Sequence, residues 1–335
     1  VGQGEATLIK CDGHSMLIDA GNNDKGTLVQ NYLQHQGVET LDYVIGTHPD
    51  ADHIGGMDVV LYKFDCKTII MPDVANNTRT YDDVVQTMKN KGYKTTYPVV
   101  GETYTIGGAA FTIIAPNKEY GNDMNSWSVG VLLQNGNHRF LFTGDAEEGA
   151  EQDILQNGID ISADVYKVAH HGSNTATSQA FLDAVHPTYA VISAGEGNSY
   201  GHPHAEVLNR LRAAGVSVFR TDEQGTIVAA SDGTTLTWNM SPSESWQAGE
   251  AEKSQNTEKS EKAADNQNNA ETDAAVSNPT DQTDGNSDVI VHITKTGEKY
   301  HSAGCQYLRQ SDIEVTLSEA KAKGLTPCSK CNPPQ

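Results

Sequence analysis

The sequence contains no run of about 18 apolar residues, the length that a helix needs to cross a bilayer. Basic residues are also scarce, with 23 Lys and Arg against 44 Asp and Glu and a formal net charge of −21. Proteins that bind nucleic acid through its phosphates usually carry a basic stripe, and none is evident here. We therefore expect no transmembrane segment in this chain, and little binding of a polyanion through a basic surface.

Two common catalytic arrangements are not evident either. The sequence shows no phosphate-cradling P-loop and no Ser/His/Asp arrangement, and Gly2-Gln3-Gly4 is too short for a nucleotide fingerprint. Ligand-type side chains are concentrated instead in the run Thr47–Gly56, directly after the apolar stretch Tyr43–Ile45. The run places two imidazoles and two carboxylates within six residues, at His48, Asp50, Asp52 and His53.

The composition of this run predicts a metal site. Burying such groups without partners costs several kcal/mol each, whereas imidazole and carboxylate both suit Zn²⁺, Mn²⁺ or Fe. An extended segment would point His48 and Asp50 the same way, and Asp52 and His53 could face a second cation from the turn. The alternative is a polar loop with a helix N-cap aspartate. A cap alone does not explain two histidines that flank two aspartates.

Three further apolar segments end in ligand-type residues. Ser15–Asp19 and His138–Asp145 each indicate a strand that ends in an aspartate. Val165–Ser173 indicates a strand that delivers His170 and His171 to a glycine turn. Taken singly, these could be ordinary strand-to-turn aspartates and a structural histidine pair. Several strands that all end in ligands favour one shared metal site.

Tyr200–His204 adds two histidines just before a predicted helix over Ala205–Ala214. A histidine in this loop could complete the coordination of a second metal ion or contact a phosphate. It could equally be a solvated residue at the start of the helix. For His202 and His204 the sequence leaves these alternatives open.

Together, these motifs resemble the metallo-β-lactamase superfamily, whose hallmark is HxHxDH. Within it they look most like the soluble domain of ComEC-type DNA-internalisation competence proteins, where an aspartate such as Asp50 often replaces the second histidine. The resemblance covers roughly residues 1 to 240 and implies an α/β (α+β) fold, the αββα sandwich. It is carried by Val1–Ala6, Leu17–Gly21, His48–His53, Phe142–Asp145, His170–Ser173 and Tyr200–His204, whose order and spacing match the family together.

The resemblance also implies roles at a dinuclear centre. Asp145 would bridge two divalent ions, and Asp19 would orient the ligands from behind. Asp50 or Asp52 would hold the attacking water, and His170 or His202 would protonate the leaving oxygen. Which of His170 and His171 binds metal stays open, with His171 preferred. The implied ligands are His48, Asp50, Asp52, His53, Asp145 and His171, and the implied substrate contacts are Asn125, Ser126, Ser173 and His204.

One departure from the superfamily bears on the metal. The superfamily supplies another ligand histidine before the bridging aspartate, but this chain has no histidine between Gly56 and His138. Asn125, Ser126 and Ser128 lie where that residue is expected. A site with fewer nitrogen and more oxygen donors is harder, so Mn²⁺ becomes credible beside Zn²⁺. The departure also counts against β-lactam hydrolysis.

The composition divides the chain into three parts. Residues 1–240 alternate short apolar strands, such as Tyr189–Ile192 and Thr226–Ala229, with amphipathic helices. One predicted helical face carries Leu28, Val29, Tyr32 and Leu33. Residues 241–288 are rich in Ser, Asn, Gln and acidic residues, and they predict a disordered acidic linker. Residues 289–335 form a small C-terminal module.

This module contains the ligands of a four-coordinate zinc site. A CxxC with an upstream His and Cys suits structural Zn²⁺, and so short a segment has little core without such a staple. The alternative is disulfides or free thiols. The module resembles the small Ada-like metal-binding modules of bacterial surface proteins. The predicted zinc ligands are His301, Cys305, Cys328 and Cys331.

These observations favour a metal-dependent hydrolase of the phosphodiesterase or nuclease type. Its phosphoester substrate would be held mainly by metal and a few cations such as Lys167, Arg210 and Arg212, with DNA as one candidate. The first alternative is a hydrolase of a lactone, a phosphocholine ester or a β-lactam. The second is a non-catalytic module that binds nucleic acid or a wall polymer. We predict no protein partner, and we expect an extracellular or cell-surface location in a bacterium, with a signal peptide not visible in this chain.

Overall fold

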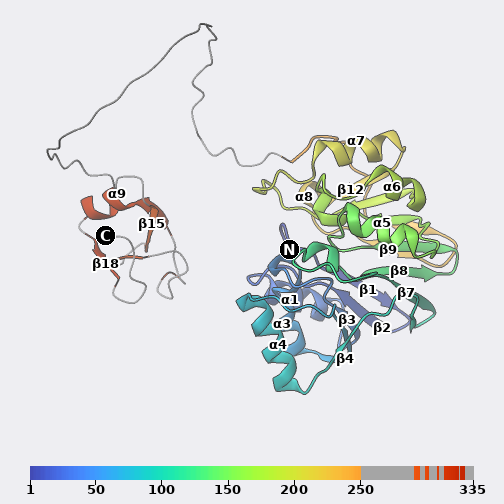
Figure 1. Ribbon diagram of the computed structural model, residues 1–335, viewed down its shortest axis with the longest axis horizontal. Helices are drawn as coiled ribbons and strands as arrows, with labels where there is room; N and C mark the ends of the chain where they lie inside the picture. The colour runs from blue at the N-terminus through green and yellow to red at the C-terminus, as the bar shows by residue number, and fades with distance from the viewer. Residues whose placement is uncertain (250–289, 295–298, 302–307, 309–312, 324, 329–335) are drawn as a thin grey trace, which may run out of the picture. The chain divides into compact units, whose positions relative to one another are not determined.

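The computed structural model describes residues 1–249, 290–294, 299–301, 308, 313–323 and 325–328. The chain divides into two compact units, Val1–Glu258 and Lys259–Gln335 (Figure 1). The division falls inside the segment predicted as a linker. None of the helices in the described ranges combines the length and apolar character that crossing a bilayer demands.

The first sheet of the larger unit has the order β1-β2-β3-β4-β5. Its first two strands form an antiparallel hairpin, and the others run parallel to β2. Three helices cover its outer face (Figure 1), packing through residues such as Val29, Leu33, Val60 and Val84. The elements are β1 (Thr7–Cys11), β2 (His14–Ile18), α1 (Gly26–His35), β3 (Thr40–Ile45), α3 (Met57–Lys63), β4 (Asp65–Ile70), α4 (Arg79–Lys91) and β5 (Thr95–Thr96).

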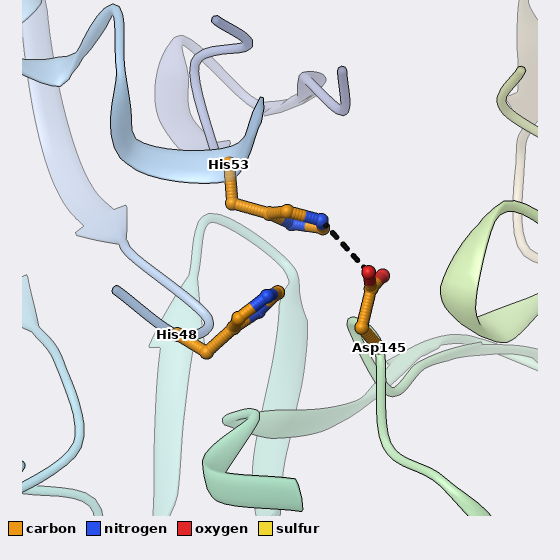
Figure 2. A group of neighbouring side chains, drawn as sticks. All are labelled: His48, His53 and Asp145. Carbon is orange, nitrogen blue, oxygen red and sulfur yellow. Dashed lines mark ion pairs between the residues drawn. The ribbon is translucent and has the colours of Figure 1, made fainter. Parts of the chain in front are cut away.

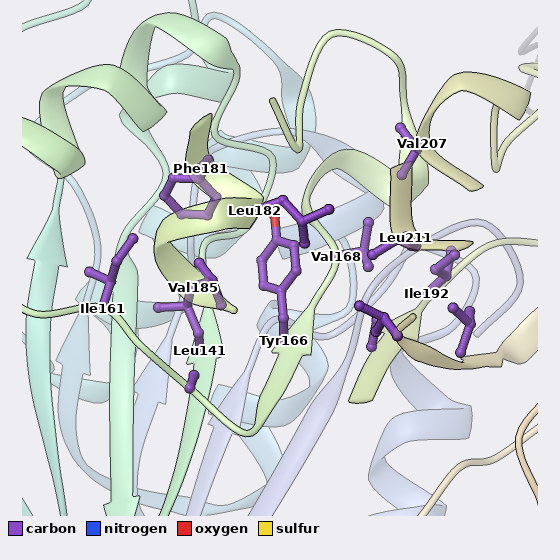
Figure 3. Close-up of a cluster of buried hydrophobic side chains, with 14 of the residues drawn as sticks. Leu141, Ile161, Tyr166, Val168, Phe181, Leu182, Val185, Ile192, Val207 and Leu211 are labelled. Atoms are coloured by element: carbon purple, nitrogen blue, oxygen red, sulfur yellow. The ribbon is translucent and has the colours of Figure 1, made fainter. Parts of the chain in front are cut away.

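The second sheet has the order β12-β11-β10-β9-β8-β7-β6. Strands β6 to β9 form an antiparallel meander, and β9 to β12 run parallel. The strands are β6 (Thr103–Ile106), β7 (Ala109–Ala115), β8 (Gly130–Asn135), β9 (His138–Phe142), β10 (Val165–Lys167), β11 (Tyr189–Ile192) and β12 (Ser217–Arg220). Helices α5 (Glu148–Gln156), α6 (Gln179–Val185) and α7 (Ala205–Ala213) cover its outer face. In Figure 3, Tyr166 of β10 packs among Phe181, Leu182 and other apolar side chains of this layer.

The two sheets pack face to face through a third apolar cluster. Met16 and Ile18 of β2 point into it, together with Phe111 and Val131 from the second sheet. Leu17 points the other way, toward the helices of the first layer. Because both faces of the strand are buried here, its last three residues, Met16, Leu17 and Ile18, are all apolar. The predicted αββα sandwich is thereby confirmed.

Some element predictions need correction. Leu28 and Tyr32 are exposed, and only Val29 and Leu33 of that predicted helical face are buried, because the buried stripe follows an i, i+4 spacing. The predicted strand Thr226–Ala229 is displaced toward β13 (Ala229–Ser231), which pairs with β14 (Leu236–Trp238) as a small hairpin. Tyr189–Ile192 matches β11.

The larger unit continues past residue 240. Ser243 N–H donates to Val218 O at 2.7 Å, and Gly249 N–H donates to Pro203 O at 2.9 Å. Trp246 packs against the outer apolar cluster of the second sheet. Residues 241–249, which composition assigns to the linker, therefore run along this unit. The apolar contact of Trp246 holds this segment on the unit, although the polar composition of the segment predicts no such contact.

Among the residues described in the smaller unit are the sheet β17-β15-β16-β18 and the helix α9. Its elements are β15 (Ile290–Ile293), β16 (Lys299–His301), β17 (Ile313–Thr316), α9 (Leu317–Ala322) and β18 (Thr326–Pro327). His301 ends β16, and Cys328 follows the parallel strand β18, donating its N–H to Tyr300 O at 2.9 Å. Both are buried at the same end of neighbouring strands. Cys305 and Cys331 lie outside the described residues, so the zinc site stays a prediction.

Candidate metal centre

Four strands of the two sheets end at one place. Thr47 and His48 follow β3, Asp19 follows β2, and Asp145 follows β9, while His171 lies in the short helix η2 (Ala169–Gly172) after β10. Asp50 begins α2 (Ala51–Ile54), which carries Asp52 and His53. The tight packing behind α2 requires glycine, because a Cβ on Gly56 would overlap the carbonyl oxygen of Ala20.

The first ligand group comprises His48, His53 and Asp145, and it is buried. Their ligand atoms all lie within 4.8 Å of one another. In Figure 2 both imidazoles point toward the Asp145 carboxylate from the opposite sheet, and His53 Nε2 is 3.2 Å from Asp145 Oδ2. Asp50 stands beside this group, with its Oδ2 3.9 Å from His48 Nε2.

The second group comprises Asp52, His53 and His171, again within 4.8 Å. His171 Nε2 lies 3.3 Å from His53 Nε2, 3.4 Å from Asp145 Oδ2 and 3.5 Å from Asp52 Oδ2. His53 and Asp145 therefore face both groups. The structure brings all six predicted ligands together.

Each of the three histidines is held by its Nδ1 and aims its Nε2 inward. His53 Nδ1 lies 2.8 Å from Asp19 Oδ2, and His171 Nδ1 lies 2.9 Å from the carbonyl oxygen of Ser193. His48 Nδ1 lies 3.1 Å from Thr47 Oγ1 and 3.3 Å from Ser128 Oγ. This is the arrangement that metal-binding histidines adopt, since a partner on one nitrogen orients the other.

Two buried atoms show that the donor set fits a cation. Within the part of the chain that the structure describes, His48 Nε2 and Asp145 Oδ1 make no hydrogen bond. Buried polar atoms are rarely left without a partner. A divalent cation satisfies nitrogen and carboxylate oxygen together without a proton. The residues present therefore fit a metal.

Comparison with known proteins settles the family. The metallo-beta-lactamase superfamily profile matches residues 1–196, more than half of the chain. The chain belongs to the metallo-β-lactamase superfamily. Members of this superfamily are generally metal-dependent hydrolases. Its HxHxDH run corresponds here to His48–His53, with Asp50 at the second histidine position.

Three bacterial relatives are similar over the same region. ComE operon protein 3 of Bacillus subtilis is 33% identical over 58% of this chain and 25% of its own length. Recombination protein 2 of Haemophilus influenzae is 33% identical over 68% of this chain and 27% of its own. Competence protein ComA of Neisseria gonorrhoeae is 29% identical over 68% and 30%. The chain thus spans less than a third of the length of these relatives, which are ComEC-type proteins.

Ser128 is one of the residues that lie where the sequence predicts the missing superfamily histidine. Ser128 Oγ lies beside His48 Nδ1 and accepts a hydrogen bond from the Asp145 N–H at 2.9 Å. Ser128 therefore contacts two of the predicted ligands, His48 and Asp145, on the side away from the metal site. Ser126 is buried in the turn η1 (Asn125–Trp127), and its N–H donates to Asp123 Oδ1. Of the serines predicted in this region, Ser128 is the one that contacts the ligand cluster.

Charge in the cluster moves the pKa values in opposite directions. Burial, together with the charge of neighbouring His53, lowers the pKa of His48 to about 4. Burial would also lower the pKa of His171, but the carboxylates of Asp145 and Asp52 raise it to about 9. Burial would raise the pKa of Asp145, yet the facing imidazoles of His53 and His171 hold it well below its usual range. The Asp145 carboxylate is therefore ionised and ready to bind a cation.

His170 lies beside the ligand cluster. Its Nε2 is 3.8 Å from Asp145 Oδ2, and its Nδ1 is 3.0 Å from Thr175 Oγ1 and 3.4 Å from Glu147 Oε1. Asn125 donates to the same Glu147 oxygen at 3.1 Å. Sequence reasoning missed Glu147, because its role depends on a contact with the distant His170. The only sequence signal is its position two residues after Asp145.

The backbone at this point is strained. His170 and His171 have φ values of 50° and 53°, in the left-handed region that residues other than glycine seldom adopt. Two such residues in succession are costly, and outliers of this kind cluster at functional sites. The strain turns the two adjacent imidazoles so that His171 joins the ligands and His170 stays partly open. Ser173 is buried, and its N–H donates to His170 O at 2.7 Å to close this turn.

The Tyr200–His204 loop lies on the far side of His171. His202 is buried, and its ring stacks on that of His171 with centroids 6.1 Å apart. Its Nδ1 lies 3.2 Å from Gln3 Nε2. Burial, with the charge of His171, lowers the pKa of His202 to about 4, so its imidazole is neutral at pH 7. His204 has both ring nitrogens within hydrogen-bonding distance of backbone groups, Asn174 N–H and Tyr200 O.

The predicted substrate-binding cations are engaged elsewhere. Lys167 is buried and pairs with Glu5 at 2.7 Å. Arg210 donates to the carbonyl oxygens of Ala176 and Thr177, and Arg212 lies over the ring of Trp246. Its buried ion pair with Glu5 makes Lys167 unavailable to a substrate, so the expectation for this residue is wrong. The expectation for Arg210 and Arg212 stays a prediction.

Proposed function

We propose that the chain is a phosphodiesterase that works with two divalent cations, Mn²⁺ or Zn²⁺. The convergence of six ligand residues from both sheets carries this proposal. His48, Asp50 and Asp145 would hold one ion, and Asp52, His53, His171 and Asp145 the other. Asp145 can bridge because its Oδ2 faces His53 and His171 while its buried Oδ1 has no hydrogen bond among the described residues. The three carboxylates in the set, Asp50, Asp52 and Asp145, favour hard cations.

The bound ions would lower the pKa of a coordinated water toward neutrality and supply positive charge opposite the developing oxyanion. The remaining chemistry belongs to the chain. Asp50 lies at the open side of the cluster, 38% exposed, and can accept a hydrogen bond from the attacking water. His170 is partly exposed next to Asp145 and can donate a proton to the leaving oxygen. Glu147 orients its ring through Nδ1.

The choice of His170 over His202 as the proton donor is part of the proposal. The buried His202 is neutral at pH 7 and contacts Gln3, whereas His170 keeps one ring nitrogen directed at the cluster. General acid catalysis by a positioned histidine typically contributes 10²–10⁴-fold, in order of magnitude. His202 then serves to support His171 from behind by ring packing.

We further propose DNA as the phosphodiester. The names of the relatives support this choice, since they refer to competence and recombination. The absence of a basic stripe from the sequence limits how the strand can be held, and so places more of the binding on the metal centre. Action outside the bacterial cell, at its surface, remains a proposal of the same kind.

A substrate panel tests the proposal. The full chain, loaded with Mn²⁺ or Zn²⁺, is assayed on bis-p-nitrophenyl phosphate, single-stranded DNA, nitrocefin and a lactone. We expect hydrolysis of both phosphodiesters and its loss by at least about a hundredfold in Asp145→Asn. Asp65→Asn, an exposed aspartate at the start of β4, is the matched control and should retain activity. An exclusive nitrocefin or lactone signal, or complete inactivity with retained DNA binding, would overturn it.

A further inference from the structure

An exposed aromatic ring stands at the rim of the metal centre. Tyr200 is 62% exposed, yet its ring stacks on His202, with centroids 5.5 Å apart and planes 19° apart. His202 stacks in turn on His171, also at 19°. Three nearly parallel rings therefore lead from a predicted metal ligand out to solvent, and the outermost is open.

The backbone of Tyr200 is fixed without help from its side chain. Asn198 accepts the N–H groups of Tyr200 and His202 at 3.2 and 3.0 Å, and it donates to His202 O. His204 Nε2 lies 3.2 Å from Tyr200 O. Among described residues the Tyr200 hydroxyl has no hydrogen-bond partner. The loop backbone is thus held in place, and it presents a ring that is largely exposed, with its hydroxyl free of hydrogen bonds among the described residues.

A polyanionic substrate needs binding contacts that do not depend on basic residues. Two buried cations of this unit are already engaged in ion pairs, Lys167 with Glu5 and Arg220 with Asp222. Residues 1–240 carry 14 basic and 29 acidic side chains. Stacking of a base on an aromatic ring requires no charge and tolerates any sequence, since every base has a π-face.

We propose that Tyr200 is the stacking platform for an unpaired nucleobase next to the phosphodiester at the metal centre. The inference rests on the proposed phosphodiesterase function and names its substrate more closely, as single-stranded nucleic acid. A base inside a duplex is already stacked on its neighbours and would have to be unstacked first. The chain should therefore prefer single strands to duplexes.

Two variants and two substrates test this proposal in the metal-loaded full chain. Tyr200→Ala should lower kcat/KM on an oligothymidylate about tenfold, mainly through KM. The loss should be absent on an oligonucleotide of the same length with abasic residues. Tyr200→Phe should behave like the parent chain. Tyr62→Ala removes an equally exposed tyrosine, 64% exposed on α3, and should change neither rate.

The outcomes separate this inference from the function on which it rests. Equal losses on both oligonucleotides, or no loss on either, would overturn the stacking role while leaving the phosphodiesterase intact. If the parent chain cleaves no phosphodiester at all, the proposed function fails. Fluorescence anisotropy of the same labelled oligonucleotides then still decides the inference. Base-dependent weakening of binding in Tyr200→Ala would support it, and identical affinities would overturn it.

Discussion

In each ligand histidine, a hydrogen-bonding partner on Nδ1 orients the ring so that Nε2 faces the metal site. His53 is oriented by Asp19, which also accepts the N–H and hydroxyl of Thr47 at 2.8 and 2.7 Å. Asp19 is fully buried and has a φ of 58°, a strained conformation for an aspartate. The buried Asp19 carboxylate therefore fixes the positions of Thr47 and His53.

Asp19→Asn tests this positioning role. The variant keeps the size of the side chain but weakens its hydrogen bond with His53 Nδ1, so the ring orientation becomes less defined. We expect the affinity for Mn²⁺ to fall about 10–100-fold, as is typical when the partner of a metal-bound histidine is lost. Calorimetric titration with Mn²⁺ measures the change. Unchanged affinity, with Asp65→Asn as the reference, would mean that Asp19 serves only the fold.

At this scale the sequence predicts the ligands better than their supports. His48, Asp50, Asp52 and His53 lie in one run, so local composition alone marks them. Ser128 and Glu147 act on residues far away in the chain, at His48 and His170. The sequence marks Ser128 only through the resemblance, as one of several residues where a histidine is expected, and it gives no comparable signal for Glu147. The same limit misled the expectation for Lys167, whose partner Glu5 is 162 positions away.

At the scale of elements, the site depends on turns that follow strands. Gly144 joins β9 to Asp145 with a φ of 54°, where a side chain is strained. A Cβ there would lie 2.7 Å from Ser128 Oγ and 2.9 Å from Thr47 Cβ. These two residues contact His48. The turn therefore needs glycine for both its conformation and its space.

Gly144→Ala should therefore destabilise the fold by more than about 1 kcal/mol and weaken metal binding. Gly149→Ala is the matched control, because nothing lies within 4 Å of its added Cβ on α5. In that helix alanine should be neutral or stabilising by up to about 1 kcal/mol. Thermal unfolding of both variants measures the difference. Equal melting temperatures would contradict the steric argument.

A second element-scale feature joins three strands at the edge opposite the metal centre. Asp42 of β3 accepts the N–H of Ser15 on β2 at 3.0 Å and pairs with Lys67 of β4 at 2.7 Å. Burial alone would raise the pKa of Asp42, but these hydrogen bonds lower it to about 2. Because the folded value lies below the unfolded one, near 3.9, the carboxylate stabilises the fold above that pH.

Asp42→Asn should therefore cost about 1 kcal/mol of unfolding free energy at pH 7, a value discounted for the exposure of Lys67. The difference from the parent chain should shrink as the pH falls below about 4 and vanish only below about pH 2, where Asp42 is protonated in the folded chain as well. Urea unfolding at several pH values measures it. A difference that is constant with pH would show that the Asp42 charge is not involved.

Helices and strands are predicted correctly from the sequence where buried residues recur at a regular spacing. Tyr189–Ile192 is a short apolar run between breakers, and it is the strand β11. The failures occur where packing departs from a simple pattern. Thr226–Ala229 looks like a core strand, yet Val228 is exposed and the pairing begins only at Ala229. Trp246 likewise anchors a segment whose polar composition predicts no contact with the fold.

At the scale of the whole molecule, the excess of acidic over basic residues limits the number of contacts that Lys and Arg can make with nucleic-acid phosphates. Few counterions are released when a strand binds without phosphate-paired Lys and Arg. We expect kcat/KM on single-stranded DNA to change less than about fivefold between 50 and 200 mM salt, against the 10³–10⁵ losses of proteins with many phosphate contacts. A steep decline with salt would reveal a basic surface that the described residues do not show.

The central claim is that remote segments of one chain hold two cations through Asp145. Electron paramagnetic resonance of the full chain titrated with Mn²⁺ tests it directly, since two ions that share a bridging carboxylate are magnetically coupled. We predict the signal of a coupled pair in the parent chain and its loss in Asp145→Asn. A signal from isolated ions alone in the parent chain, or a coupled signal that survives in the variant, would contradict the account.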